Sequence, residues 1–261
     1  MSFSIFDTNA HPTLTGRWGN KDLDASFEKL DQEVRLQGYR RACAVGLAGQ
    51  ESYDHARFAQ ACHPFNNLVP IAGCTLHSPK EMDHELGMLQ DLGFKGVKLH
   101  PKDPRLDLSD PRFPPFLEIA HRRSLPVFLC TYLHSPLADY PSTDPLYQWI
   151  SILKKVPEAR VVLIHGGDVR LLQYAEVVRF NPNLLLDLSQ TIMKYPGSSL
   201  DLDLRFLFES FDRRICIGTD FPEYSLQAVK KRFEKFALGL SQEKSDNIAF
   251  RNIETFLGLS E

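Results

Sequence analysis

The sequence predicts an α/β fold in which eight parallel strands alternate with helices and close into a single (β/α)8 barrel of the TIM type. Short apolar runs alternate with stretches of helical spacing at intervals of about 25–35 residues, which suits such a barrel. Several runs are almost continuously apolar, as expected for strands that are covered on both faces. Four of the runs end in a polar residue followed by turn sequence, at His11, His100, His165 and Asp220. These polar ends predict a shared rim, which is where parallel barrels carry out chemistry.

The strands follow from the apolar runs in chain order. Each run is rich in Val, Ile, Leu, Phe or Cys and is bounded by turn residues or by polar sequence. We expect strands at residues 3–9, 41–47, 68–74, 94–100, 125–131, 160–165, 183–189 and 214–220.

The helices follow from apolar residues that recur every three or four positions between these runs. Phe27, Leu30 and Val34 are one such set, and Pro115 suits the first turn of a helix. We expect helical sequence at residues 23–39, 79–92, 116–123, 144–156, 169–179, 206–211, 226–238 and 244–257.

A doubly wound open sheet is the main competing architecture. That fold normally carries a glycine-rich phosphate turn after an early strand, and neither GxGxxG nor GxxxxGK[ST] occurs in this sequence. The chain also has no linker, low-complexity tract or charge run that would divide it. We therefore expect one barrel domain over residues 1–261, long enough to bury a large core.

Composition and charge indicate which kinds of binding partner the protein is expected to have. The net charge of −3 and the lack of a basic run give no indication of binding to nucleic acid or to a membrane surface. No apolar segment approaches the roughly 18–20 residues that a membrane span needs. The amino terminus lacks a signal-peptide pattern, and the five cysteines are odd in number without CxxC spacing. The expectation is a cytoplasmic protein with a small-molecule substrate; self-association is left open.

Alternation within the strands predicts which polar residues face the barrel mouth, because residues two apart share a side. Burying that many ionisable groups without partners would cost several kcal/mol each, so we expect them to act together. The candidates are Asp7, Asn9, His11, Lys98, His100, Cys130, His165, Asp187, Ser189 and Asp220.

Several motifs, in order along the whole chain, resemble the amidohydrolase superfamily. Asp7-Thr-Asn-Ala-His11 is similar to its Asp-x-His-x-His opening. The segments 93–101, 163–167 and 218–222 resemble strands four, six and eight of its amidohydrolase-related branch, and 252–259 resembles the last helix.

The resemblance implies one or two divalent metals, usually zinc, that activate water. It carries over His11, His165 and Asp220 as ligands, but Asn9 and Cys130 stand where the family has histidines. A thiolate is a good zinc ligand, so a mononuclear site of His11, Cys130 and Asp220 is one outcome. The other is that the metal is lost and Asp220 acts as a general base, as in some superfamily members.

Each candidate also has a purely structural interpretation. His11 could be a hydrogen bonder at a strand end, Cys130 a buried thiol, and Lys98 a partner of Asp7 instead of a substrate-carboxylate ligand or a carbamylated metal bridge. Arg17, beside Trp18, suits an anionic, partly planar substrate but could equally be solvated. The remaining histidines are expected at the surface: His55, His63, His77, His84, His121 and His134.

The resemblance and the rim residues together predict a small-molecule hydrolase that acts on an amide, lactone or ester. Asp220 would activate water, His165 would orient or protonate the developing oxyanion, and His11 and Lys98 would stabilise charge. Asn9, His100 and Arg17 are expected to contact substrate. The alternatives are a metal-independent lactonase, an aromatic-acid decarboxylase, and a catalytically silent barrel with a binding role.

Overall fold

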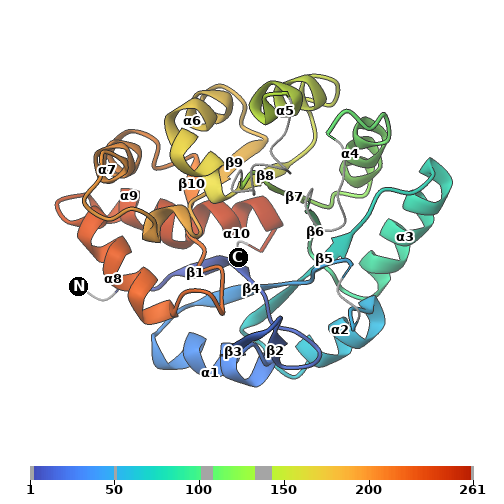
Figure 1. The fold of residues 1–261 in the computed structure, drawn as a ribbon, viewed down its shortest axis with the longest axis horizontal. Coiled ribbons are helices and arrows are strands. Elements are labelled where there is room, and N and C mark those ends of the chain that lie inside the picture. Colours follow the sequence, from blue (N-terminus) through green and yellow to red (C-terminus); the bar gives the residue numbers. More distant parts are fainter. Residues whose placement is uncertain (1–2, 50–51, 101–107, 133–142, 260–261) are drawn as a thin grey trace.

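Eight parallel strands in chain order form the sheet at the centre of the molecule (Figure 1). The computed structural model describes residues 3–49, 52–100, 108–132 and 143–259. The strands are β1 (Phe6–Ala10), β4 (Arg41–Val45), β5 (Leu68–Cys74), β6 (Val97–Leu99), β7 (Val127–Cys130), β8 (Val161–Ile164), β9 (Leu184–Asp187) and β10 (Ile215–Cys216). Each pairs in parallel with the next.

The first and last strands close the sheet into a barrel. The Thr8 amide donates to the Ile217 carbonyl at 2.9 Å, and the His11 amide donates to the Phe221 carbonyl at 2.8 Å. The predicted (β/α)8 barrel is therefore confirmed, and each expected strand overlaps an observed one, with β1 ending one residue later than expected.

Helices surround this sheet (Figure 1). Their starts agree with local sequence: Ser78 caps α3 in a reciprocal box with Glu81, with Pro79 in the first turn. The helices are α1 (Phe27–Leu36), α2 (His55–Cys62), α3 (Pro79–Asp91), α4 (Phe113–Arg122), α5 (Pro145–Leu153), α6 (Leu171–Arg179), α7 (Leu200–Ser210), α8 (Leu226–Ala237), α9 (Gln242–Asp246) and α10 (Asn252–Leu257), with shorter turns at η2 (His165–Arg170), η3 (Thr191–Met193) and η4 (Asn247–Arg251). In the described part of the chain, none of the helices is long and apolar enough to cross a membrane.

The barrel has two apolar layers. The outer one joins strands to helices, while an inner cluster that includes Phe6, Phe128 and Cys216 packs with Ile253 and Phe256 of the carboxy-terminal helix. Cys216 is fully buried, as a core role predicts. The helix α10 thus seals one end of the barrel.

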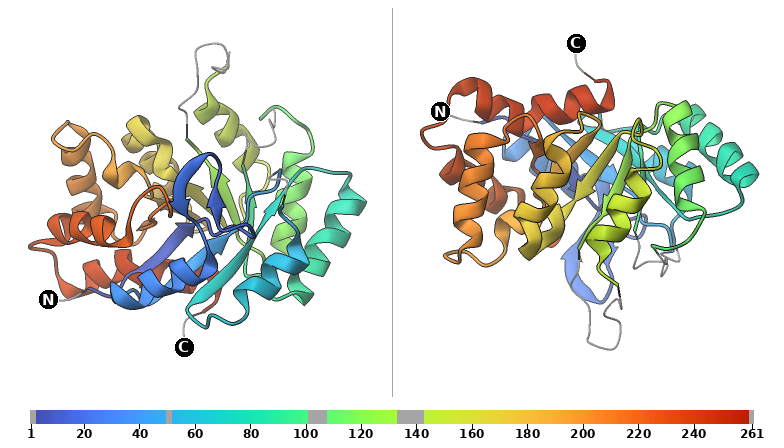
Figure 2. Two further views of the ribbon diagram at one scale, coloured as in Figure 1. Left: turned by 60° about the horizontal axis from the view of Figure 1, so that its bottom comes forward. Right: turned by 90° about the horizontal axis from the view of Figure 1, so that it is seen from above.

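A short antiparallel hairpin, β2 (Arg17–Trp18) with β3 (Lys21–Asp24), follows β1. The sequence predicted neither this hairpin nor the helix α2 (His55–Cys62). Figure 2 shows the hairpin and α10 at opposite ends of the barrel. The hairpin therefore lies over the end that the polar residues face.

Candidate functional site

Polar side chains from three strand ends form a connected hydrogen-bond chain in the barrel mouth. Lys98, on β6, donates from Nζ to Asn9 Oδ1 at 3.1 Å. Asn9 in turn donates from Nδ2 to Asp220 Oδ1 at 3.0 Å. All three residues are at least nine-tenths buried, and the Asp220 backbone amide donates to the Asn9 carbonyl at 2.7 Å. The backbone bond that closes the barrel therefore also fixes the carboxylate against the amide.

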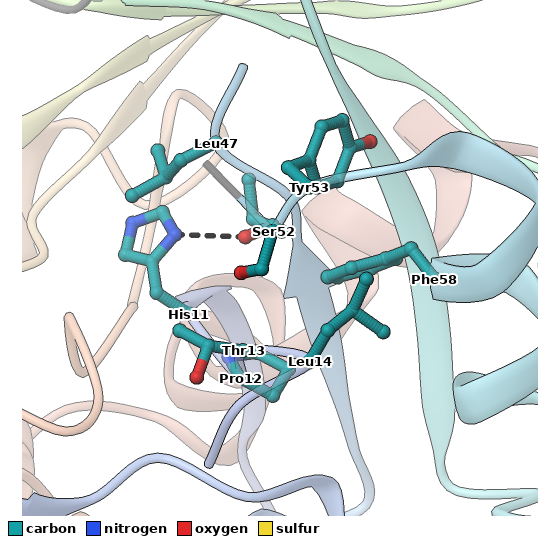
Figure 3. Close-up of a pocket in the computed structure, with 9 residues that line it drawn as sticks. His11, Pro12, Thr13, Leu14, Leu47, Ser52, Tyr53 and Phe58 are labelled. Atoms are coloured by element: carbon teal, nitrogen blue, oxygen red, sulfur yellow. Dashed lines mark hydrogen bonds between the residues drawn. The ribbon is translucent and has the colours of Figure 1, made fainter. Parts of the chain in front are cut away.

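His11 is held as a neutral imidazole. Its Nδ1 lies 2.9 Å from the Val45 carbonyl oxygen, which requires a proton on Nδ1 (Figure 3). Its Nε2 therefore accepts from Lys98 Nζ, at 3.1 Å. Burial and then the Lys98 charge hold the pKa of His11 well below its usual range. The 3.6 Å approach of Nε2 to Asp220 Oδ1 consequently joins two acceptors and is neither an ion pair nor a hydrogen bond.

A small cavity lies behind His11. Its volume is about 10 Å³, and its lining includes Leu14, Ser52 and Tyr53 (Figure 3). Such a volume holds about one water molecule. The cavity is too small for a substrate.

Cys130 forms a second group with two histidines. Burial raises the pKa of its thiol, but the charges and hydrogen bonds of His100 and His165 outweigh burial and bring that pKa well below the ordinary value. Burial lowers the pKa of His165, but the Asp220 charge and the Cys130 hydrogen bond raise it overall to about 9. Both shifts favour a thiolate at Cys130 beside an imidazolium at His165.

Main-chain geometry presents both His165 and Asp220. Each has a left-handed backbone conformation, with φ of 68° and 58°, which costs a side-chain-bearing residue about 1–3 kcal/mol and is concentrated at functional sites. Residue 167 must be a glycine, because a Cβ there would lie 1.9 Å from the Tyr174 ring. The His-Gly-Gly sequence is thus a requirement of the turn that positions the imidazole.

Two further buried carboxylates, Asp187 and Asp7, accept hydrogen bonds from serine and threonine hydroxyls. Thr8 and Ser189 donate their hydroxyls to Asp187, and Ser189 also lies 3.0 Å from His165 Nδ1. Thr219 binds Asp7 through both its backbone amide and its hydroxyl. Burial raises the pKa of Asp7 to about 7 despite these donors.

Aromatic rings flank the two site histidines. Trp18, on the hairpin, stacks on His11 with ring centroids 5.7 Å apart and planes 15° from parallel. Its indole donates to Glu223, which also binds Lys21 and so ties the hairpin to the segment after β10. On the other side, Tyr132 packs edge-on against His165 at 5.7 Å.

The predicted site residues are not all brought together. Asn9, His11, Lys98 and Asp220 form one contact group, and His100, Cys130 and His165 form the other. Lys98 binds Asn9 and His11, not Asp7, while Asp7 pairs with Thr219. Arg17 lies exposed on β2, outside the buried cluster.

Other assignments change with the structure. His55 is a correction: the sequence placed it at the surface, but its side chain is only 19% exposed and its Nε2 lies 2.9 Å from the Gly73 carbonyl. The sequence placed Ser189 at the mouth with Asp187 but assigned it no partner; its hydroxyl donates to Asp187 and lies 3.0 Å from His165 Nδ1. His134 lies outside the described residues.

The predicted zinc ligands His11, Cys130 and Asp220 do not fit a metal as arranged. The His11 nitrogen that would ligate already accepts from Lys98, and Asn9 supplies an amide where a second histidine would stand. Within the described ranges, three histidine, cysteine or carboxylate ligand atoms come within 4.8 Å of one another only at His55, Cys74 and Glu85. Lys98 thus supplies the hydrogen-bond donor beside His11, and burial lowers the pKa of its amine while the charges of Cys130 and Asp220 oppose that shift.

Solved structures share this fold over nearly their whole length. An uncharacterised TIM-barrel protein from Bordetella bronchiseptica matches with a TM-score of 0.80 at 20% identity, covering 98% of this chain and 99% of that one. A putative 2-pyrone-4,6-dicarboxylic acid hydrolase from Pseudomonas putida matches with a TM-score of 0.72 at 16% identity, covering 99% and 98%. A 5-carboxyvanillate decarboxylase from Novosphingobium aromaticivorans, complexed with manganese, matches with a TM-score of 0.70 at 13% identity, covering 98% and 96%.

The family model described as amidohydrolase matches residues 4–259. That span includes every strand of the barrel and every residue of the two contact groups. The ordered motifs, the (β/α)8 barrel and this match agree: the chain belongs to the amidohydrolase-2 family.

Proposed function

We propose that this protein hydrolyses a small lactone or ester that carries a carboxylate, without a metal ion at the barrel mouth. The observation that carries the proposal is the buried chain from Lys98 through Asn9 to Asp220, which places a cation and a carboxylate on either side of one amide. The Lys98 contact with His11 supports the metal-independent form.

Asp220 acts as the general base. Burial raises its pKa, while the charges of His165 and Lys98 lower it in part, so the carboxylate is a stronger base than a solvated aspartate. It takes a proton from water as the water oxygen attacks the substrate carbonyl carbon. When the tetrahedral intermediate collapses and the carbon–oxygen bond breaks, the leaving oxygen takes that proton from Asp220. The products are a carboxylic acid and a hydroxyl group.

Lys98 and His165 stabilise the negative charge that develops on the carbonyl oxygen. Both are almost fully buried, and the high pKa of His165 keeps it cationic at neutral pH. Donors placed in a site that excludes water contribute more than the same donors in solution. Neutral His11 fixes the Lys98 ammonium through its Nε2.

The walls of the mouth favour a planar, anionic substrate. Trp18 and Tyr132 offer aromatic surface beside His11 and His165, and the buried cations would attract a carboxylate. A 2-pyrone, as in the name of the Pseudomonas putida neighbour, is a planar unsaturated lactone. At 16% identity this neighbour supports the substrate class by analogy alone.

The test is a substrate panel of planar carboxylated lactones, aryl esters and aromatic acids, assayed with and without a chelator. We expect lactone or ester hydrolysis that resists chelation and is abolished in Asp220→Asn. The control Asp31→Asn removes a buried carboxylate on α1, away from the mouth, and should retain activity. Activity lost on chelation and restored by zinc or manganese would refute the metal-independent form. Release of carbon dioxide from an aromatic acid would refute hydrolysis.

A further inference from the structure

A second group of potential ligands lies away from the contact groups of the barrel mouth. His55 opens α2, Cys74 ends β5, and Glu85 lies on α3. Their ligand atoms all lie within 4.8 Å of one another. Three consecutive elements of the barrel therefore each contribute one donor to the same point.

The donors are chemically matched to one metal. Imidazole nitrogen, thiolate sulfur and carboxylate oxygen are the three protein ligands of zinc, and a thiolate disfavours magnesium and calcium. Cys74 is 1% exposed, while the side chains of His55 and Glu85 are 19% and 17% exposed. The group is thus enclosed by protein but retains access to water.

One carboxylate oxygen of Glu85 lacks a hydrogen-bond partner among the described residues. Within the described part of the chain, its buried Oε2 makes no hydrogen bond, and its Oε1 lies 3.8 Å from His55 Nε2, too far for one. A buried carboxylate oxygen without a partner destabilises the folded protein. Burial accordingly raises the pKa of Glu85, with the charges of His55 and His77 opposing it. A bound cation would satisfy this oxygen.

Packing holds the imidazole in place. The His55 ring meets the ring of Tyr53 edge-on at 5.2 Å and that of Phe94 at 6.2 Å. The Tyr53 hydroxyl accepts from the Gly73 amide at 2.9 Å. Gly46 leaves room for this tyrosine, because a Cβ there would lie 2.2 Å from its ring. Such second-layer contacts are what orient a metal ligand.

We propose that His55, Cys74 and Glu85 bind one zinc ion, with water as the fourth ligand. Binding displaces the Cys74 thiol proton to solvent. One ring nitrogen of His55 donates its lone pair to the ion. The ion would tie α2 and α3 to the end of β5. This site is separate from the proposed reaction, so either proposal can fail without the other.

Cobalt(II) provides the test, because a cobalt–thiolate bond gives a charge-transfer band in the near ultraviolet. Titration of the purified full chain should give one equivalent with this band. Cys74→Ser should abolish it. Cys62→Ser removes another buried thiol, on α2, and Cys130→Ser removes the thiol of the barrel mouth; both should retain the band. His55→Gln and Glu85→Gln should weaken binding by more than about tenfold, the least that even altering a ligand's own partner typically costs.

Thermal unfolding with and without zinc distinguishes loss of metal binding from loss of folding in a destabilised variant. The melting temperature of the wild type should rise with zinc, and that of a folded Cys74→Ser protein should not. The proposal is overturned if the wild type binds no stoichiometric cobalt or if the band survives in Cys74→Ser. It is also overturned if the band disappears in Cys130→Ser alone, which would place the metal in the barrel mouth.

Discussion

Replacing Lys98 with methionine should separate catalysis from stability. Methionine fills a similar volume but cannot donate to Asn9 Oδ1 or His11 Nε2, both of which Lys98 contacts at 3.1 Å. Lys98 is only 1% exposed. The substitution therefore removes the buried ammonium group and leaves the surrounding side chains in place.

The magnitudes follow from these contacts. Losing an oxyanion donor costs about 2.7–4 kcal/mol, or about 10²–10³ in kcat. Leaving two buried acceptors unpaired destabilises by about 1–3 kcal/mol each. Removing a buried charge stabilises the fold by several kcal/mol, because its desolvation penalty is no longer incurred. The last two effects oppose each other, so the free energy of unfolding should change by less than about 2 kcal/mol while kcat falls at least about a hundredfold.

The assay pairs steady-state kinetics on a hydrolysed lactone or ester with urea unfolding. Lys230→Met is the control. Lys230 lies on α8 in the outer layer and donates to the Gln37 carbonyl, so its replacement should leave kcat unchanged. The reasoning fails if Lys98→Met retains kcat within about threefold. It also fails if the variant loses more than about 4 kcal/mol of stability, because the ammonium would then be chiefly structural.

Three further outcomes are expected. Burial raises the pKa of Asp7 from 3.8 to about 7, so the contribution of this residue to stability is full below pH 4 and is lost as the pH rises through 7. Relative to Asp7→Asn, the wild type should lose about 4 kcal/mol of unfolding free energy between pH 4 and pH 8. Urea titrations at each pH measure this difference, and parallel pH profiles of the two proteins would contradict the prediction. The lowered pKa of Cys130 predicts ultraviolet thiolate absorbance at pH 7 that disappears in Cys130→Ser and persists in Cys216→Ser; equal spectra would show that no thiolate forms. Glu223→Gln should loosen the Trp18 hairpin and raise KM more than it lowers kcat, whereas unchanged KM would separate the hairpin from substrate binding.

The strands were predictable because the barrel buries them on both faces, which leaves apolar runs that end where the polar rim begins. The missed elements lack such a signal. Lys21–Asp24 is exposed or partly exposed along its whole length, so neither face shows an apolar pattern. His55–Cys62 buries only Phe58 and Cys62 over its eight residues, too few to set a helical period.

The site was predictable only as a set of residues. Polar strand ends indicate which side chains reach the mouth, but not which atoms meet there. That Lys98 takes the lone pair of His11 depends on a distance of 3.1 Å between strands 87 positions apart. His55 was placed at the surface because the carbonyl of Gly73 and the ring of Tyr53, which enclose it, come from other elements.

The bond between Asn9 and Asp220 joins positions 211 residues apart. During synthesis on the ribosome, the Asn9 amide is made before the next seven strands of the barrel, whereas the Asp220 carboxylate follows the last of them. Contacts this distant form late and slow folding. A nascent or truncated chain that lacks the last strand would therefore lack the carboxylate that we propose as the general base, and activity would appear only once the whole barrel has been made.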